Sequence, residues 1–378
     1  MTLREKNALD RRTETVSRNS NIELLRIIAM IMIIAHHFSV HGEFYYGAER
    51  VTVTRLWVQF LAMGGKIGVN IFILISGYFL ICASDIKTSK VIRLWVQVFS
   101  YSVAIYAVFV CLGLVPFQGK TLMGRLLPIG FREWWFASVY FLLYILSPYI
   151  NRVIHSMNKR DYQGLLLIMT FFWCVIPTFL NKGMESNELC WFVYLYTLGG
   201  YVRLHASDGR KRGGSYIAAG MGMAALTLLL ILLCDLIGTR IPYIADRAMY
   251  LYGLQALTTL LTALFLFVGF LRIDIGNGRI VNLLASATFG VYLIHDDNYV
   301  RPFLWKTLFH NAQYSHSRRL SPYSIAVILV VYAVCTGIEL LRLYLVEKRY
   351  LSLLNKVSNR VENGIQKVLD NLILDKIL

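Results

Sequence analysis

The stretch NIELLRIIAMIMIIAHHFSVHG, residues 21–42, is a nearly continuous apolar run that holds several ionisable side chains. About 20 mostly apolar residues are enough for a helix to cross a bilayer. The run ends without a small-residue cleavage site, so we expect an uncleaved first membrane helix rather than a removable signal peptide. Ionisable groups are costly inside a membrane, so this helix is also the first place to look for a functional site.

The composition of the whole chain also indicates a membrane protein. Of its 378 residues, 57% are hydrophobic and 16% are charged, whereas soluble chains have about 45–50% apolar and about 25% charged residues. This excludes a soluble enzyme, a disordered chain and a disulfide-rich secreted module, and it predicts an all-α polytopic membrane protein. The net charge of +16 comes mainly from short stretches between apolar runs, where basic residues set topology. No nucleic-acid-binding pattern accompanies them, so we expect no nucleic acid partner.

Ten apolar runs are candidate spans. They lie near residues 22–41, 67–83, 92–115, 134–153, 162–180, 189–204, 216–237, 250–270, 282–300 and 323–346. With both termini in the cytoplasm, the inner segments hold 23 Lys and Arg residues and the outer segments hold 13, as the positive-inside rule requires. We therefore expect a cytoplasmic segment over 1–20, a membrane domain over 21–346 and a cytoplasmic tail over 347–378. The longest loops fall near 42–66 and 301–322.

The tail has a helical stripe of apolar residues. The stripe is formed by Leu354, Val357, Val361, Ile365, Val368 and Leu372. This spacing predicts a C-terminal amphipathic helix. It would lie on the inner leaflet or pack on another chain.

The spacing within the first run places two of its ionisable residues on one face. Arg26 and His37 are eleven residues apart, so on a helix they differ in direction by about 20° and lie about 16 Å apart along the axis. His36 is about 80° off that face, and His41 follows His37 by one turn. Lipid would not tolerate such a face, so it must line a polar cavity.

Plainer roles exist for each of these residues. Arg26 can snorkel to the inner headgroups and pair with Glu23, and His37 can make a structural hydrogen bond. Two histidines four residues apart also suit a metal, but the segment from His37 to His41 lacks the Glu of a zincin and no third ligand is evident. We therefore expect no metal site.

Four sequence motifs together resemble the membrane acyltransferase-3 family. Arg, ten residues and His is the family's hallmark in the first helix, and Arg26 and His37 match it. IGVNIFILISGYFL (67–80) resembles the second-helix motif, KVIR (90–93) the basic motif before the third helix, and FGVYLIH (289–295) a late-helix motif. The motifs occur in the family's order, and the resemblance covers about residues 20–346.

The resemblance implies acyl transfer from a cytoplasmic acyl-CoA, usually acetyl-CoA, to a hydroxyl of a cell-surface or lipid-linked polysaccharide. It also implies a bacterial cytoplasmic membrane and no permanently bound cofactor. His37 is then the catalytic residue, either as general base or as a covalent relay. Arg26, Lys90 and Arg93 lie toward the cytoplasm, where they suit donor phosphates, although Lys90 and Arg93 also fit ordinary topology signals. Asn70 is a candidate cavity-lining or oxyanion donor.

One motif departs from the family pattern. Many members have Trp followed five residues later by Glu in the fourth helix, whereas this chain has Trp135 and then Tyr140. The role of that Glu cannot be carried over, and both residues are candidates for the acceptor side. His295, with Asp296 and Asp297, is a further candidate there, although the simpler interpretation is a cluster at the end of the ninth helix that faces water.

A transporter or flippase for a glycan or small substrate is the main alternative. Ten spans with a buried Arg and His suit a substrate or proton pathway equally well. A non-catalytic scaffold is a weaker alternative because the histidines are clustered. The order of the motifs favours the enzyme.

Overall fold

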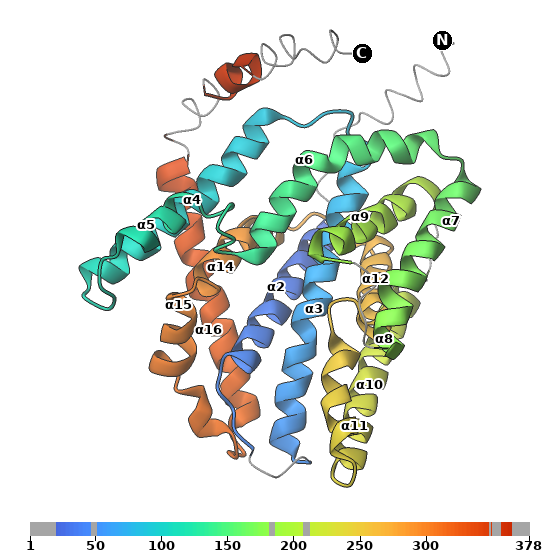
Figure 1. The fold of residues 1–378 in the computed structure, drawn as a ribbon, viewed down its shortest axis with the longest axis vertical. Helices are drawn as coiled ribbons and strands as arrows, with labels where there is room; N and C mark the ends of the chain where they lie inside the picture. The colour runs from blue at the N-terminus through green and yellow to red at the C-terminus, as the bar shows by residue number, and fades with distance from the viewer. Residues whose placement is uncertain are drawn as a thin grey trace.

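A computed structural model describes residues 20–46, 51–180, 186–206, 212–347, 349 and 357–364. The regular elements of these residues are helices (Figure 1). They are α2 (Ser20–Val40), α3 (Val53–Leu80), α4 (Thr88–Cys111), α5 (Gly119–Leu126), α6 (Trp135–Ser156), α7 (Lys159–Thr170), η1 (Phe171–Val175), α8 (Ile176–Leu180), α9 (Glu188–His205), α10 (Gly213–Gly238), α11 (Pro242–Arg247), η3 (Ala248–Tyr252), α12 (Leu257–Leu271), α13 (Arg279–Ser286), α14 (Thr288–His295), α15 (Val300–Pro302), η4 (Phe303–Leu308), η5 (Asn311–Tyr314), α16 (Leu320–Leu341) and η6 (Arg342–Glu347). The chain is an all-α polytopic membrane protein.

Eight helical stretches among the described residues are long and apolar enough to cross a membrane. They are Ser20–Val40, Val53–Leu80, Thr88–Cys111, Trp135–Ser156, Lys159–Leu180, Gly213–Gly238, Pro242–Leu271 and Leu320–Glu347. Each overlaps one predicted span. The other two predicted spans, 189–204 and 282–300, are also helical, but they correspond to α9 and to the shorter apolar stretch Arg279–His295, which fall outside this set.

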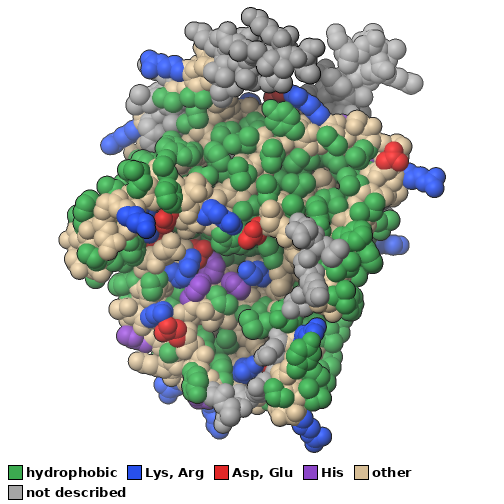
Figure 2. Space-filling view, viewed as in Figure 1, with side chains coloured by type: hydrophobic (Ala, Val, Ile, Leu, Met, Phe, Trp, Pro, Cys, Tyr) green, Lys and Arg blue, Asp and Glu red, His purple; other side chains and the backbone are tan. Residues whose placement is uncertain are grey.

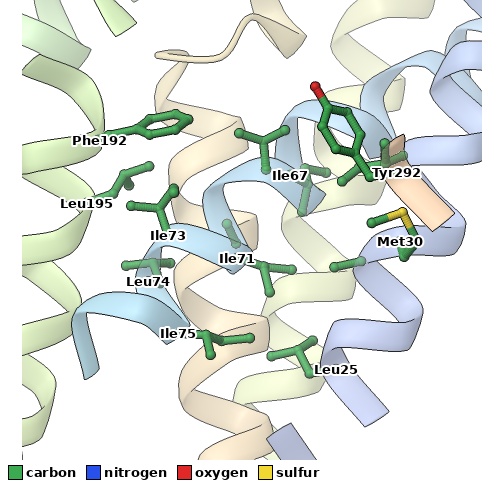
Figure 3. Close-up of a cluster of buried hydrophobic side chains, with 14 of the residues drawn as sticks. Leu25, Met30, Ile67, Ile71, Ile73, Leu74, Ile75, Phe192, Leu195 and Tyr292 are labelled. Carbon is green, nitrogen blue, oxygen red and sulfur yellow. The ribbon is translucent and has the colours of Figure 1, made fainter. Parts of the chain in front are cut away.

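Helix α9 lies in the interior of the bundle, which explains its weaker apolar signal. Figure 3 shows Phe192 and Leu195 of α9 directed at the isoleucine and leucine side chains of α3. The two helices approach so closely that a Cβ on Gly77 would lie 2.1 Å from the Tyr196 carbonyl oxygen, and one on Gly199 would lie 2.2 Å from the Leu74 carbonyl oxygen. A helix surrounded by protein can carry more polar groups than one that faces lipid.

Helix α3 begins well before the predicted span, so the prediction of a long loop over residues 42–66 was wrong. The residues from Val53 to Lys66 are helical, although Arg55 and Gln59 interrupt the apolar pattern. Both side chains donate hydrogen bonds to Asp235, a buried residue of α10, at distances of 2.8–3.3 Å. These bonds satisfy the polar groups inside the bundle, which a hydropathy criterion cannot anticipate.

The ninth predicted span is two short helices. Helix α13 ends at Ser286, and α14 runs from Thr288 to His295. The three residues His295, Asp296 and Asp297 are each at most 2% exposed. The interpretation of this cluster as facing water was therefore wrong, because the three side chains contact His37, Arg301 and Arg125. The chain continues from α14 into α15 and η4, which lie at one side of the molecule next to α16 (Figure 1).

The predicted amphipathic tail falls mostly outside the described residues. Residues 357–364 are helical, and Val357 and Val361 are 42% and 39% exposed. Leu354, Ile365, Val368 and Leu372 lie outside the described part of the chain. The limits of the three predicted segments, 1–20, 21–346 and 347–378, remain predictions.

Candidate active site

A cavity of about 510 Å³ lies among α2, α3, α4, α6 and α14. Its wall is largely apolar and aromatic, and Arg26 and His37 both line it. Figure 2 shows histidine, basic and acidic side chains gathered at a hollow within a largely hydrophobic face of the molecule. The first helix therefore turns Arg26 and His37 toward a common space, as their spacing predicts. Pairing of Arg26 with Glu23 also occurs, with Nη1 3.4 Å from the Glu23 carboxylate, but it leaves Arg26 in the cavity wall.

The buried ring of His37 is held by a second histidine. Its Nδ1 lies 2.9 Å from Nε2 of His295, and Nδ1 of His295 lies 2.6 Å from the Val291 carbonyl oxygen. A carbonyl only accepts, so His295 carries its proton on Nδ1 and leaves Nε2 as an acceptor. His37 must then donate through Nδ1, which leaves its own Nε2 unprotonated. The hydrogen-bond chain thus assigns the tautomer of His37.

The two carboxylates that follow α14 pair with arginine side chains. Nε of Arg301 donates to Asp296 Oδ1 at 2.9 Å, and Asp296 Oδ1 lies 3.5 Å from Nδ1 of His37. Asp297 pairs with Arg125, a fully buried side chain of α5 that stacks on Tyr299 at 4.7 Å from the ring centroid. Buried charges are tolerated only when paired, and these pairs tie α5, α14 and α15 to one another.

Comparison with known proteins identifies the family. A family model described as an acyltransferase domain matches residues 19–340. The chain belongs to the acyltransferase-3 family. Searches of the curated proteins and of the solved structures each found no match. The cavity lies wholly within the matched residues, so this membrane acyltransferase carries its candidate site in the family domain.

The end of the acyltransferase cavity that holds Arg26 also carries the other two predicted basic residues. Arg93 lines the main cavity, and Lys90 lines an adjoining cavity of about 280 Å³ that also includes Arg26. The Arg93 guanidinium forms an ion pair with Glu347, which also accepts from Arg342 at 2.7 Å. The three predicted cations therefore line two cavities that share wall residues, and two of them, Arg26 and Arg93, each pair with a carboxylate.

Two aromatic residues of α6, both candidates for the acceptor side, lie in the cavity wall. Trp135 and Tyr140 both line the main cavity. The Tyr140 ring stacks on Phe136 with centroids 5.9 Å apart, and its hydroxyl lies 3.5 Å from Ser76 Oγ. The family's Glu position is thus occupied by a neutral side chain that still faces the cavity.

Asn70 is placed differently from its prediction. It is fully buried but does not line either cavity described above. Its Nδ2 donates to the Leu254 carbonyl at 3.1 Å, and its Oδ1 accepts from Trp191 Nε1 at 3.0 Å. Both ends of the amide are used to join α3 to α9 and to the segment before α12, so Asn70 is a structural residue and not an oxyanion donor.

The structure supplies the third metal-ligand candidate that the sequence did not reveal. Ligand atoms of His37, His41 and Asp296 lie within 4.8 Å of one another. However, Asp296 Oδ1 already accepts from Arg301, and Nδ1 of His37 faces His295. Binding of a cation there would compete with the guanidinium of Arg301 and break the contact between the two histidines.

Two of the cavity residues that sequence reasoning did not single out are Lys66 and Tyr292. Lys66 was assigned to an outer loop because it precedes the apolar motif, yet it lies on α3 with Nζ 5.7 Å from the Trp135 ring centroid. Tyr292 lies within the late-helix motif, three residues before His295, and its place on the same side of the helix could have marked it.

Proposed function

We propose that this acyltransferase moves an acyl group, with acetyl as the proposed group, from cytoplasmic acyl-CoA to a hydroxyl of a cell-surface or lipid-linked polysaccharide. One observation carries the proposal: a single cavity joins a cationic end, with Arg26 and Arg93, to a histidine with a free ring nitrogen, His37. Cations suit the phosphates of CoA, and a neutral histidine suits the removal of a hydroxyl proton.

The tautomer of His37 supports its role as general base. Its Nε2 would take the proton of the acceptor hydroxyl while the hydroxyl oxygen forms a bond to the thioester carbonyl carbon. The resulting imidazolium would then return that proton to the departing thiolate as the C–S bond breaks. His295, which accepts from Nδ1, is a positioning residue in this scheme, because it holds the ring and its tautomer without touching the substrate.

The same nitrogen serves the covalent alternative. In that route Nε2 of His37 attacks the thioester, and the acyl-imidazole then passes the group to the acceptor. Incubation with radiolabelled acetyl-CoA without acceptor separates the two routes, because only the covalent route leaves label on the protein after rapid denaturation.

The proposal is tested by acyl transfer in membranes. Membranes that contain the protein should move label from radiolabelled acetyl-CoA into the glycan fraction of the host. Loss of a general base costs about 10²–10⁴ in rate, so His37→Gln should lose transfer while it still inserts and accumulates. His155→Gln, a change at an exposed histidine at the other end of α6, is the matched control. Wild-type transfer by His37→Gln would remove the catalytic assignment and favour the transporter alternative.

We also propose the bacterial cytoplasmic membrane, with both termini in the cytoplasm. The excess of Lys and Arg in the predicted inner segments supports this orientation, and so does the even number of candidate spans among the described residues. Reporter fusions at residues 1 and 378 should both report the cytoplasm. Opposite locations would show that α9 or the pair α13–α14 has been assigned the wrong number of crossings.

A further inference from the structure

The geometry points to an oxyanion site formed by Lys66 and Tyr292. We propose that these two side chains stabilise the negative charge that develops on the thioester carbonyl oxygen during acyl transfer. The inference rests on the proposed function, and it names the groups that the reaction needs besides the base. Preorganised donors at a developing charge are commonly the largest contribution to catalysis of acyl transfer.

The position of Lys66 along the bundle matches that of His37. The residue before it, Gly65, packs so closely on His36 that an added Cβ would lie 2.4 Å from His36 Cβ. Lys66 therefore lies at about the same height in the bundle as His36 and His37. It lines the same cavity as His37. Its Nζ lies over the Trp135 ring, and it forms no salt bridge within 4.0 Å in the described part of the chain.

Other cations are less suited to this role. Nε of Arg301 is bound to Asp296, and Arg26 and Arg93 line the cationic end of the cavity, away from His37. Lys66 is thus the cavity-lining cation near His37 whose charge is not already paired with a carboxylate at hydrogen-bond distance. Its ammonium supplies three donors.

Tyr292 provides an independent observation. It is 5% exposed and lines the cavity. Its hydroxyl lies near the Asp296 carboxylate and the Phe136 backbone but forms no hydrogen bond of ordinary geometry among the described residues. Figure 3 shows Tyr292 at the edge of the hydrophobic cluster, with its hydroxyl directed away from the cluster. A buried hydroxyl without a partner costs about 1–3 kcal/mol, and such groups are commonly kept for a ligand or a reaction.

The chemical step balances with these groups in place. The acceptor oxygen bonds to the carbonyl carbon as its proton moves to Nε2 of His37, and the C=O electron pair moves to the oxygen held by Lys66 and Tyr292. When that pair returns to form the ester carbonyl, the C–S bond breaks. The thiolate of CoA then takes the proton from His37.

The experiment compares Tyr292→Phe, Lys66→Met and Lys66→Arg in membranes with radiolabelled acetyl-CoA at varied concentration. Loss of one oxyanion donor costs about 10²–10³ in kcat, and we expect that loss for Lys66→Met, part of it for Tyr292→Phe, and partial recovery in Lys66→Arg. The KM for acetyl-CoA should stay near the wild-type value in all three. Tyr332→Phe is the matched control, because its hydroxyl is also buried and forms no hydrogen bond of ordinary geometry among the described residues, although it lies near Thr336, and it does not line the cavity.

A structural role would give another pattern. Removal of a hydroxyl that forms no ordinary hydrogen bond should leave the thermal stability of Tyr292→Phe in detergent unchanged or higher. A fall in kcat at unchanged thermal stability would then not come from unfolding. Wild-type kcat in both Tyr292→Phe and Lys66→Met overturns the inference, as does a raised KM at unchanged kcat. Failure of the proposed function looks different, because then the wild-type protein itself consumes no thioester.

Discussion

The two ends of the cavity are built differently. At the histidine end, His37, His295 and Asp296 are buried and each has a partner within 3.5 Å. At the cationic end, the side chains of Arg26 and Arg93 are 32% and 52% exposed, whereas their carboxylate partners Glu23 and Glu347 are 14% and 3% exposed. Buried, fixed groups suit a reaction that needs accurate geometry. Exposed cations suit capture of a soluble anion, because surface ion pairs are weak and easily exchanged.

This contrast predicts that a change at the histidine end affects kcat, and a change at the cationic end affects KM for the donor. Partner exchange at the cationic end is the expected event during donor binding. Glu347 pairs with Arg93, and a donor phosphate that binds Arg93 would compete with that carboxylate.

His295 should show the largest effect of the variants that sharpen this contrast. His295→Ala removes the acceptor for Nδ1 of His37 and frees the ring, and a displacement of about 1 Å can cost about a hundredfold in kcat. His295→Gln should recover part of the loss, because its amide oxygen can accept the same hydrogen bond. Initial rates at varied acetyl-CoA would test this, with KM for the donor expected to stay unchanged.

Two results would contradict a positioning role for His295. The first is equal loss in His295→Ala and His295→Gln with both proteins folded, which would indicate that an imidazole is needed there for chemistry. The second is a rise in donor KM at unchanged kcat. Thermal unfolding in detergent serves as the control, because His295 is buried and its removal leaves a cavity.

Arg26 should give a smaller effect, and on the other kinetic parameter. Arg26→Ala removes a charge from the cationic end, and we expect KM for acetyl-CoA to rise about tenfold, which corresponds to about 1.4 kcal/mol. Arg26→Lys keeps the charge but loses the bidentate geometry, so its rise should be smaller. Arg152→Ala, at an exposed arginine of α6, is the matched control. An unchanged KM in Arg26→Ala would leave Arg26 as a headgroup anchor paired with Glu23.

The sequence predicted relations within a helix better than relations between helices. The common direction of Arg26 and His37 follows from helical geometry alone, and both residues do line one cavity. The contact between His37 and His295 joins positions 258 residues apart, and no local pattern contains that information. A hydropathy criterion also assigned Lys66 to a loop. Such a criterion uses only the polarity of each side chain, and it contains no information on the cavity or partner that stabilises a polar side chain inside a bundle.

The smallest effect is expected at His36, the neighbour of the proposed base. Its Nδ1 lies 2.5 Å from the Ala62 carbonyl oxygen, so this ring ties α2 to α3 although it also borders the cavity. The amide of His36→Gln can donate to the same carbonyl, and we expect transfer within about threefold of wild type, with a loss of stability no larger than about 0.5–1.5 kcal/mol for one weakened hydrogen bond. Transfer normalised to protein level, together with thermal unfolding in detergent, would check both expectations. If His36→Gln were folded but inactive, the base would lie on the adjacent face of α2. The contrast between a buried reactive end and an exposed binding end would then survive, but the assignment of His37 and its partner His295 to the reaction would not.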